Sequence, residues 1–276
     1  MTLTLAFSPC PNDTFIFDAL VNKKINNRFT FDVHISDVEN LNNNALNNMY
    51  DITKISYHAY AFCSREYQVL DAGSALGYGN GPLVVSKRKI YPDELKDARI
   101  AIPGKYTTAN LLLGIVFPDT INKKEYLFSD IEDVVLSDEV DAGLLIHENR
   151  FTYEKRGLKL ILDLGKWWEQ NINEPIPLGA IVIKRSLPDE VKNSVNDLIK
   201  NSLNVAYTNP DGTRNYIGQY AASLDEKVIK QHIDLYVNDF TLELGEKGKN
   251  AINVLYKKAG EAGVIPTVPA DIFLTD

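Results

Sequence analysis

The stretch Asp141-Ala-Gly-Leu-Leu-Ile-His147-Glu-Asn-Arg150 decides how the chain is interpreted. Its apolar run, 143–146, contains branched residues and is typical of a buried strand in a parallel sheet. The run ends on His147, where the sequence turns polar at once. Ligands of open α/β sheets bind beyond the carboxyl ends of the strands, and a histidine titrates near neutral pH. The pattern therefore marks His147 either as a candidate catalytic residue or as a loop histidine that hydrogen-bonds its own turn.

The composition is that of an ordinary globular protein, and it excludes some classes of function. The 276 residues suffice for two average domains or one large one. A net charge of −8 argues against nucleic-acid binding, because phosphate contacts require clustered Lys and Arg. No apolar stretch approaches the ~20 residues of a membrane helix, and no leader pattern opens the chain, so we expect a cytoplasmic protein without a membrane partner. Cys10 and Cys63 have no zinc-ligand neighbours in sequence, which favours two free thiols and no metal.

The amino-terminal segment predicts a strand, a loop and a helix. Residues 2–7 alternate between apolar and polar, and two prolines then break the strand. We expect a helix from about Thr14, with Asn12 or Asp13 as its cap. This loop would present a hydroxyl, an amide and a helix N-terminus, a combination that suits an anion. An ordinary proline-stiffened cap explains the same residues.

Two further segments carry candidate binding residues. A strand is expected over 51–56, ending on Lys54, Ile55 and Ser56, and a helix over 57–69. After a strand at 99–102, Thr107 or Thr108 can cap an apolar helix over 109–117. The free N–H groups at such a helix start form a second candidate anion site, and an ordinary threonine cap is the alternative.

The order of elements predicts an α/β protein with two domains. Four glycines between 73 and 82 precede a strand at 83–86, and their spacing is not that of a dinucleotide fingerprint. We expect the chain to cross between domains near 84–88 and to return near 178–184. Residues 1–86 plus 182–276 would form one domain and residues 87–181 the other, with a central cleft between them. From 188 onward the apolar spacing is mainly helical.

Several motifs taken together resemble one family. They are Ser8-Pro-Cys-Pro-Asn-Asp-Thr-Phe15, Lys54-Ile-Ser-Tyr-His58, Ala75-Leu-Gly-Tyr-Gly-Asn-Gly-Pro82, Pro103-Gly-Lys-Tyr-Thr-Thr-Ala-Asn110, His147-Glu-Asn-Arg-Phe151, Asp163-Leu-Gly-Lys-Trp-Trp168, Pro175-Ile-Pro-Leu-Gly179 and His232-Ile-Asp-Leu-Tyr-Val-Asn238. The chain resembles the 1,4-dihydroxy-6-naphthoate synthases, futalosine-pathway enzymes of menaquinone biosynthesis. The resemblance implies a fold like that of the type II periplasmic solute-binding proteins, with two α/β domains, a central cleft and two hinge crossings.

The resemblance also implies a reaction and a set of site residues. A carbon–carbon lyase would convert cyclic dehypoxanthinyl futalosine to 1,4-dihydroxy-6-naphthoate and release a three-carbon fragment. It implies His147 as the proton acceptor, and it places substrate contacts at 54–56 and 107–109. Those contacts are Lys54, Ile55, Ser56, Thr107, Thr108 and Ala109, and the loop residue Asn12 is our own addition from its place before the first helix. Asn80 departs from the family pattern, where a small residue is expected.

The expected partner is a small molecule, and the chemistry needs neither a metal nor an organic cofactor. His58 and His232 are rivals of His147 for the role of base, but both fall in helical patterns, where packing or capping explains them. A chorismate dehydratase of the same pathway and a solute-binding protein without catalysis are the alternative functions.

Overall fold

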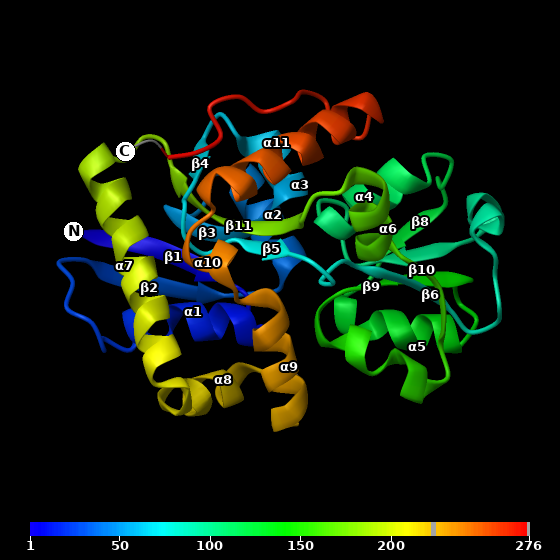
Figure 1. Cartoon of the computed structure of the whole chain (residues 1–276), viewed down its shortest axis with the longest axis horizontal. Helices are drawn as coiled ribbons and strands as arrows, with labels where there is room; N and C mark the ends of the chain where they lie inside the picture. Colours follow the sequence, from blue (N-terminus) through cyan, green and yellow to red (C-terminus); the bar gives the residue numbers. More distant parts are fainter. Residues whose placement is uncertain (222–224, 275–276) are drawn as a thin grey trace.

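Figure 1 shows the computed structural model of the chain, which describes residues 1–221 and 225–274. Two sheets lie side by side, and helices pack around each of them. The first sheet has the order β2-β1-β3-β11-β4, with β5 also paired to β11; its strands are β1 (Thr2–Phe7), β2 (Thr30–Ile35), β3 (Ile52–Ser56), β4 (Tyr67–Val69), β5 (Ala75–Gly77) and β11 (Ile176–Lys184). The second has the order β10-β6-β9-β7-β8; its strands are β6 (Leu83–Ser86), β7 (Ile100–Ile102), β8 (Lys123–Glu125), β9 (Ala142–Leu145) and β10 (Lys159–Asp163).

The predicted α/β architecture is confirmed, with each half of the molecule built on one sheet. We call residues 1–77 and 176–274, where described, the terminal lobe, and residues 83–172 the middle lobe. Both chain ends lie in the terminal lobe (Figure 1). The helices of this lobe are α1 (Pro11–Val21), α2 (Val38–Leu46), α3 (Tyr57–Cys63), α7 (Asp189–Thr208), α8 (Arg214–Tyr220), α9 (Glu226–Tyr236), α10 (Asp239–Leu242) and α11 (Gly245–Glu261). The middle lobe contains α4 (Thr108–Val116), α5 (Ile131–Leu136) and α6 (Leu164–Ile172).

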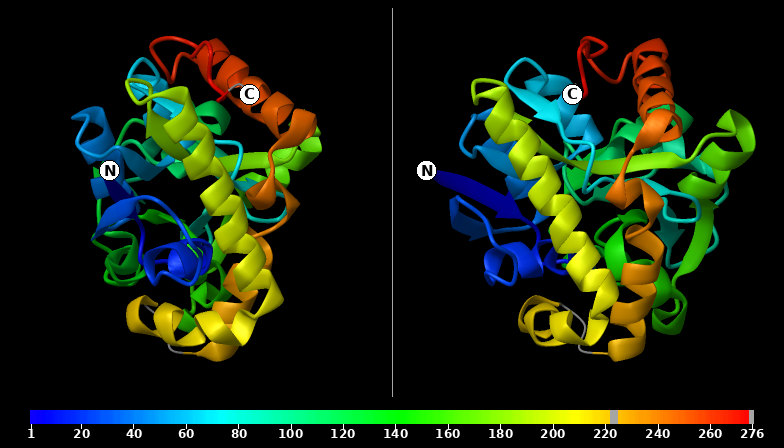
Figure 2. Two further views of the ribbon diagram at one scale, coloured as in Figure 1. Left: turned by 90° about the vertical axis from the view of Figure 1, so that its left-hand side faces the viewer. Right: turned by 60° about the vertical axis from the view of Figure 1, so that its left-hand side comes forward.

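Parallel pairing sets the direction in which the strands point. β1 pairs parallel with β2 and β3 in the terminal lobe, and β7 pairs parallel with β8 and β9 in the middle lobe. The return strand β11 runs antiparallel to β3 and lies between β3 and β4 in the first sheet. The long helix α7 packs on α1 and crosses this end of the molecule obliquely (Figure 2).

The chain passes between the lobes earlier than the sequence indicated. Residues 83–86 already pair with β9 and β10 in the second sheet, and β11 pairs with β3, β4 and β5 over its whole length. The passages are therefore 78–82 and 173–175, rather than 84–88 and 178–184. A short apolar run in the sequence does not distinguish a strand within a sheet from a segment that crosses between lobes, which explains why the crossings were misplaced. The division into two domains at 86/87 and 181/182 stays a prediction. The first boundary would assign β6 to the terminal domain although it pairs in the second sheet, and the second would cut β11.

One glycine in the first passage has a clear packing reason. A Cβ built on Gly81 would lie 2.2 Å from the Cα of Gly165, at the start of α6. Only glycine at both positions allows this close approach of backbones. The passage is therefore pressed against the helix that precedes the second passage.

Several predicted element ends shift for local reasons. The first helix begins at Pro11 rather than near Thr14, because proline suits the first position of a helix. Asn12 and Asp13 therefore lie in its first turn and do not cap it. The helix expected over 57–69 ends at Cys63, and its last apolar residues form β4 instead. Thr107 caps α4 through its hydroxyl, as one alternative held.

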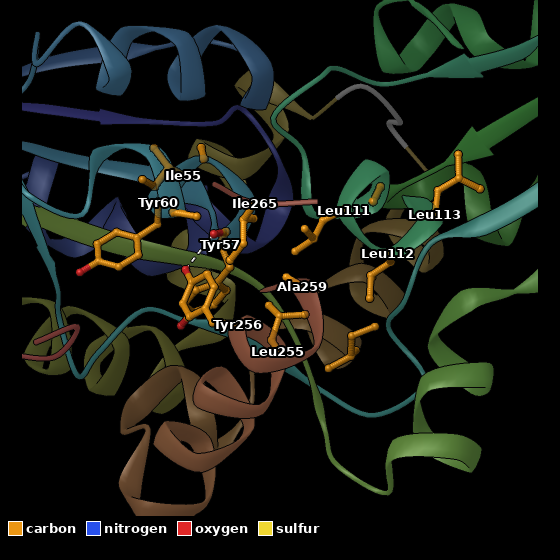
Figure 3. Close-up of a cluster of buried hydrophobic side chains, with 14 of the residues drawn as sticks. Ile55, Tyr57, Tyr60, Leu111, Leu112, Leu113, Leu255, Tyr256, Ala259 and Ile265 are labelled. Atoms are coloured by element: carbon orange, nitrogen blue, oxygen red, sulfur yellow. Dashed lines mark hydrogen bonds between the residues drawn. The ribbon is translucent and has the colours of Figure 1, made fainter. Parts of the chain in front are cut away.

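The largest apolar core joins the two lobes on one side (Figure 3). Leu111 and Leu112 of α4 belong to the same cluster as Tyr57 of α3 and Leu255 of α11. The hydroxyl of Tyr256 also donates to the backbone oxygen of Tyr57 at 2.8 Å. Burial of this size is the dominant stabilising contribution in a fold. None of the described helices combines the length and apolarity needed to cross a membrane.

We predict a pH-dependent stability from His58, which lies in α3 against the start of α4. Its Nδ1–H donates to the backbone oxygen of Thr107 at 3.1 Å, and burial lowers its pKa from 6.5 to about 4. The unfolded chain therefore takes up this proton first as the pH falls, so stability declines between pH 6.5 and about 4. The full decline from this group amounts to about 3 kcal/mol.

The measurement is urea unfolding of the wild type and His58→Gln at several pH values, with pH 7.5 as the common reference. The variant should lose less stability than the wild type on going from pH 7.5 to 4.5. Parallel declines in the two proteins would contradict the prediction.

Candidate active site

A cavity lies between the lobes, and every residue predicted for the site borders it. The predicted residues on its wall are Asn12, Lys54, Ile55, Ser56, Thr107, Thr108, Ala109 and His147. The carboxyl ends of β1, β3, β7 and β9 lead into the segments that supply these residues. Ligands of open α/β sheets bind at this position. Segments that are far apart in the sequence thus meet at one cavity, and their role in binding and catalysis stays a prediction.

A buried ion pair forms part of the cavity wall in the terminal lobe. The ammonium of Lys54 lies 3.3 Å from Oδ1 of Asp13, and it also donates to the backbone oxygen of Gly73 at 2.6 Å. Asp13 is 2% exposed and accepts hydrogen bonds from the Ser8 hydroxyl at 2.6 Å and from Nδ2 of Asn12 at 2.9 Å. The ammonium of Lys54 thus donates one hydrogen bond inside the protein and has Asp13 as its ionic partner.

The hydroxyl groups and the helix N-terminus at the cavity differ in which hydrogen bonds they can still make to a ligand. The Ser56 hydroxyl accepts from Nδ2 of Asn42 at 3.2 Å, which leaves its own proton for another acceptor. Thr107 donates to the backbone oxygen of Gly104 at 2.8 Å, and Thr108 donates to that of Leu178. The protons of both threonines are therefore engaged. The backbone N–H groups at the start of α4 are the better donors to an anion, as helix N-termini are in general.

His147 follows β9 by two residues and has an unusual backbone. Its φ is +57°, in the left-handed region that L residues rarely adopt. The ring of Phe128 lies edge-on to that of His147, with 5.0 Å between centroids. The Cys10 sulfur lies 3.4 Å from Nδ1 and 3.8 Å from Nε2. Burial lowers the pKa of His147 from its ordinary 6.5, and the nearby carboxylates of Glu148 and Asp13 oppose that change.

His232 of α9 completes the surroundings of His147, and the sequence did not indicate this role. Its ring is parallel to that of His147 within 13°, with 6.0 Å between centroids. Its Nε2 donates to Oδ1 of Asn12 at 2.9 Å. Burial lowers the pKa of His232 well below 6.5, and the charge of His147 adds to that effect. His58, the other rival, packs in α3 behind Thr107 and is absent from the described cavity wall.

Other cavity residues were also missed or only noted in the sequence. Tyr236, at the end of α9, borders the cavity, and burial raises its pKa to about 12. Asn80 borders it from the first passage; neither polar atom of its side chain has a hydrogen-bond partner in the described chain. Cys10 is not part of the cavity wall but contacts His147; it precedes α1, and no sequence pattern marks it. The helical spacing around Tyr236 and the single thiol of Cys10 did not indicate in the sequence that these residues lie near the cavity.

Comparison with known proteins places this geometry in a family. A family model described as "Menaquinone biosynthesis" matches residues 3–261. The chain belongs to this menaquinone-biosynthesis family. A protein of Thermus thermophilus named 1,4-dihydroxy-6-naphtoate synthase is 39% identical over 272 residues, which cover 99% of each chain. A protein of the same name from Streptomyces coelicolor is 38% identical and covers 98% of this chain and 97% of its own.

Two solved structures show what the fold is similar to. A crystal structure from Archaeoglobus fulgidus superposes with a TM-score of 0.91 at 40% identity, over 96% of this chain and 98% of its own. The alkanesulfonate-binding protein of Xanthomonas axonopodis superposes with a TM-score of 0.76 at 12% identity, over 99% and 97%. At that identity the second likeness shows the fold alone. The periplasmic-binding-protein-like fold expected from the sequence is thereby confirmed.

We predict that Lys54 and Asp13 depend on each other for the stability of the fold. Lys54→Met leaves the Asp13 carboxylate buried without its cation, which should lower the free energy of unfolding by about 3–5 kcal/mol. The double variant Lys54→Met/Asp13→Asn should recover part of that loss, because neither charge then remains.

A double-mutant cycle measured by urea unfolding tests this coupling. The exposed pair of Lys230 and Asp234 in α9 is the control, and Lys230→Met should cost under about 0.5 kcal/mol. Losses that simply add in the double variant would show that the buried pair is not coupled.

Proposed function

We propose that this chain is a 1,4-dihydroxy-6-naphthoate synthase. In this role it acts as a carbon–carbon lyase on cyclic dehypoxanthinyl futalosine and releases a three-carbon fragment. The observation that carries the proposal is the joint placement of the family-matched segments on one cavity wall, with His147 beside them. The names of two relatives that match over nearly the full length support the same activity.

The substrate carries an aromatic carboxylate and a sugar-derived polyol, and the cavity offers partners for both. The carboxylate fits the N–H groups at the start of α4, where the helix dipole favours negative charge. Lys54 remains a candidate for a direct contact, through an N–H that the bond to Gly73 does not use. The Ser56 hydroxyl can donate to a substrate oxygen, and Thr107 and Thr108 can still accept from substrate hydroxyls.

His147 has the properties of a general base in this reaction. Its lowered pKa keeps the imidazole neutral at pH 7, so that one nitrogen can accept a proton. Removal of a proton from a substrate hydroxyl or from an acidified carbon starts the cleavage. A positioned base contributes roughly 10²–10⁴-fold in rate. The Cys10 thiol, whose pKa is raised by burial, is the neutral neighbour at the nitrogen edge of this ring.

The two alternative functions have less support. A solute-binding protein without catalysis rests on structural likeness at 12% identity, which concerns the fold alone. A chorismate dehydratase of the same pathway would not explain the names of the two relatives. Incubation with cyclic dehypoxanthinyl futalosine and, separately, with chorismate, followed by mass analysis of the products, distinguishes the three functions. Formation of 1,4-dihydroxy-6-naphthoate from the first substrate alone is the expected result.

We predict that His147→Asn loses about 10²-fold or more in kcat, the scale of a missing general base. KM and the folded state should change little, since asparagine fits the same space and adopts the left-handed backbone more readily than most residues. In the wild type, activity should fall as the pH drops, with a midpoint below 6.5, because the base must be neutral and its pKa is lowered.

The measurements are steady-state kinetics from pH 5 to 8 and circular dichroism of the variant. His58→Asn is the comparison, because His58 is buried but does not border the cavity. A His147→Asn variant with near-normal kcat would remove His147 from the role of base.

A further inference from the structure

The hydrogen bonds behind His147 determine which nitrogen of His232 carries a proton. Nδ2 of Asn12 donates to the Asp13 carboxylate at 2.9 Å, and a carboxylate in an ion pair can only accept. This contact fixes the orientation of the Asn12 amide, so its oxygen faces Nε2 of His232 at 2.9 Å. Nε2 of His232 must therefore be the protonated nitrogen. The pKa of this ring is lowered well below 6.5, so its other nitrogen, Nδ1, carries a lone pair.

That lone pair faces a second buried acceptor. Nδ1 of His232 lies 3.8 Å from Oε2 of Glu148, and neither atom has a hydrogen-bond partner within the described residues. His232 is fully buried and Glu148 is 9% exposed. A buried polar atom without a partner costs about 1–3 kcal/mol. Here two such atoms lie 3.8 Å apart: Glu148 follows His147 in the sequence, and the ring of His232 stacks on that of His147. Stability alone does not explain this arrangement.

The other ionisable groups around His147 are neutral or already paired. Asp13 is paired with Lys54, and Arg150 donates to Gly81 and lies 3.6 Å from Asp163. The Cys10 thiol and the Tyr236 hydroxyl are neutral, because burial raises the pKa of each. Glu148 is thus the carboxylate near His147 that lacks a cationic partner in the described structure. A negative charge placed in advance stabilises a positive charge that forms during a reaction.

We propose that His232 and Glu148 form a buried support for the base: His232 holds the His147 ring from one side, and the Glu148 carboxylate offsets the positive charge that His147 acquires with the proton. The inference rests on the proposed function. His232 is a positioning residue, since it reaches the reaction only through His147. His232 belongs to the terminal lobe and His147 to the middle lobe, so His232 can position the ring of His147 only when the two lobes are in contact.

The two residues should act on different quantities. Glu148→Gln keeps the shape but removes the charge that raises the pKa of His147. The pKa of His147 should fall further, which moves the acid limb of the kcat/KM profile to lower pH. A weaker base should also lower kcat at neutral pH. His232→Phe keeps a parallel ring but loses the bond to Asn12. It should lower kcat on the order of ten-fold, with little effect on KM and no shift of the acid limb.

The decisive experiment is an NMR titration of the histidine side chains, combined with pH–rate profiles of the same proteins. The signal of His147 is assigned through His147→Asn. In Glu148→Gln its midpoint should move to lower pH. Glu132→Gln is the matched control, because Glu132 is a buried carboxylate of the middle lobe with one unpartnered oxygen among the described atoms, and its other oxygen is paired with Arg156. It does not border the cavity, so the midpoint of His147 should stay in place.

Each outcome separates the inference from the proposed function. An unchanged or raised midpoint in Glu148→Gln overturns the role of Glu148, and normal kcat in His232→Phe overturns that of His232. His232→Gln, which keeps a donor for Asn12, should recover part of the activity, and an equal loss in both variants would also count against positioning. The titration does not require turnover. If the midpoint of His147 shifts as expected in Glu148→Gln but the wild type fails to convert cyclic dehypoxanthinyl futalosine, the function is refuted and the electrostatic support stays intact.

Discussion

The buried pair of Asp13 and Lys54 is the interaction on which the site depends. A charge inside a protein must be paired and hydrogen-bonded, and this requirement fixes three separate segments at one point. Lys54 lies in the middle of β3, Asp13 lies in the first turn of α1, and Gly73 precedes β5. From this pair a chain of contacts leads outward through Asn12 to His232 and on to His147. The position of His147, the proposed base in the middle lobe, is thus linked by contacts to an ion pair in the terminal lobe.

Contacts between the lobes differ in character from one region to another. The core around α4 and α11 is continuous and mainly apolar, and the hydroxyl of Tyr256 makes its hydrogen bond inside it (Figure 3). At Glu39 of α2 the contact is polar: one carboxylate oxygen accepts from the backbone N–H of Tyr106 at 2.9 Å, and the other accepts from Asn42. Burial raises the pKa of Glu39 to about 7. Separation of the lobes would expose the whole apolar area to water, whereas at Glu39 it would break only the hydrogen bonding of one carboxylate.

The sequence revealed the parts of the site that follow from strand ends and helix caps. A strand that turns polar at His147, and a threonine before an apolar helix, are local signals with a direct physical cause, and both are confirmed by the structure. The sequence offered His232 as a rival base and explained it by packing or capping in a helix. Its place beside His147 depends on tertiary structure, and helical spacing reports only which side of a helix is buried. The passages were misplaced for a related reason. Apolar residues in β6 and β11 indicate burial, but they do not say in which sheet the burial occurs.

The backbone of His147 shows what separates this cavity from a simple binding cleft. A left-handed φ at a residue other than glycine costs of order 1–3 kcal/mol, and such strain persists only where the surroundings impose it. Here the surroundings are Phe128 from the middle lobe and Cys10 and His232 from the terminal lobe. In a two-lobed fold, closure around a ligand needs only contacts from each side. With the proposed base on one lobe and the ring that positions it on the other, closure would be coupled to the position of His147, so that the same motion that encloses a substrate would also orient the group proposed to act on it.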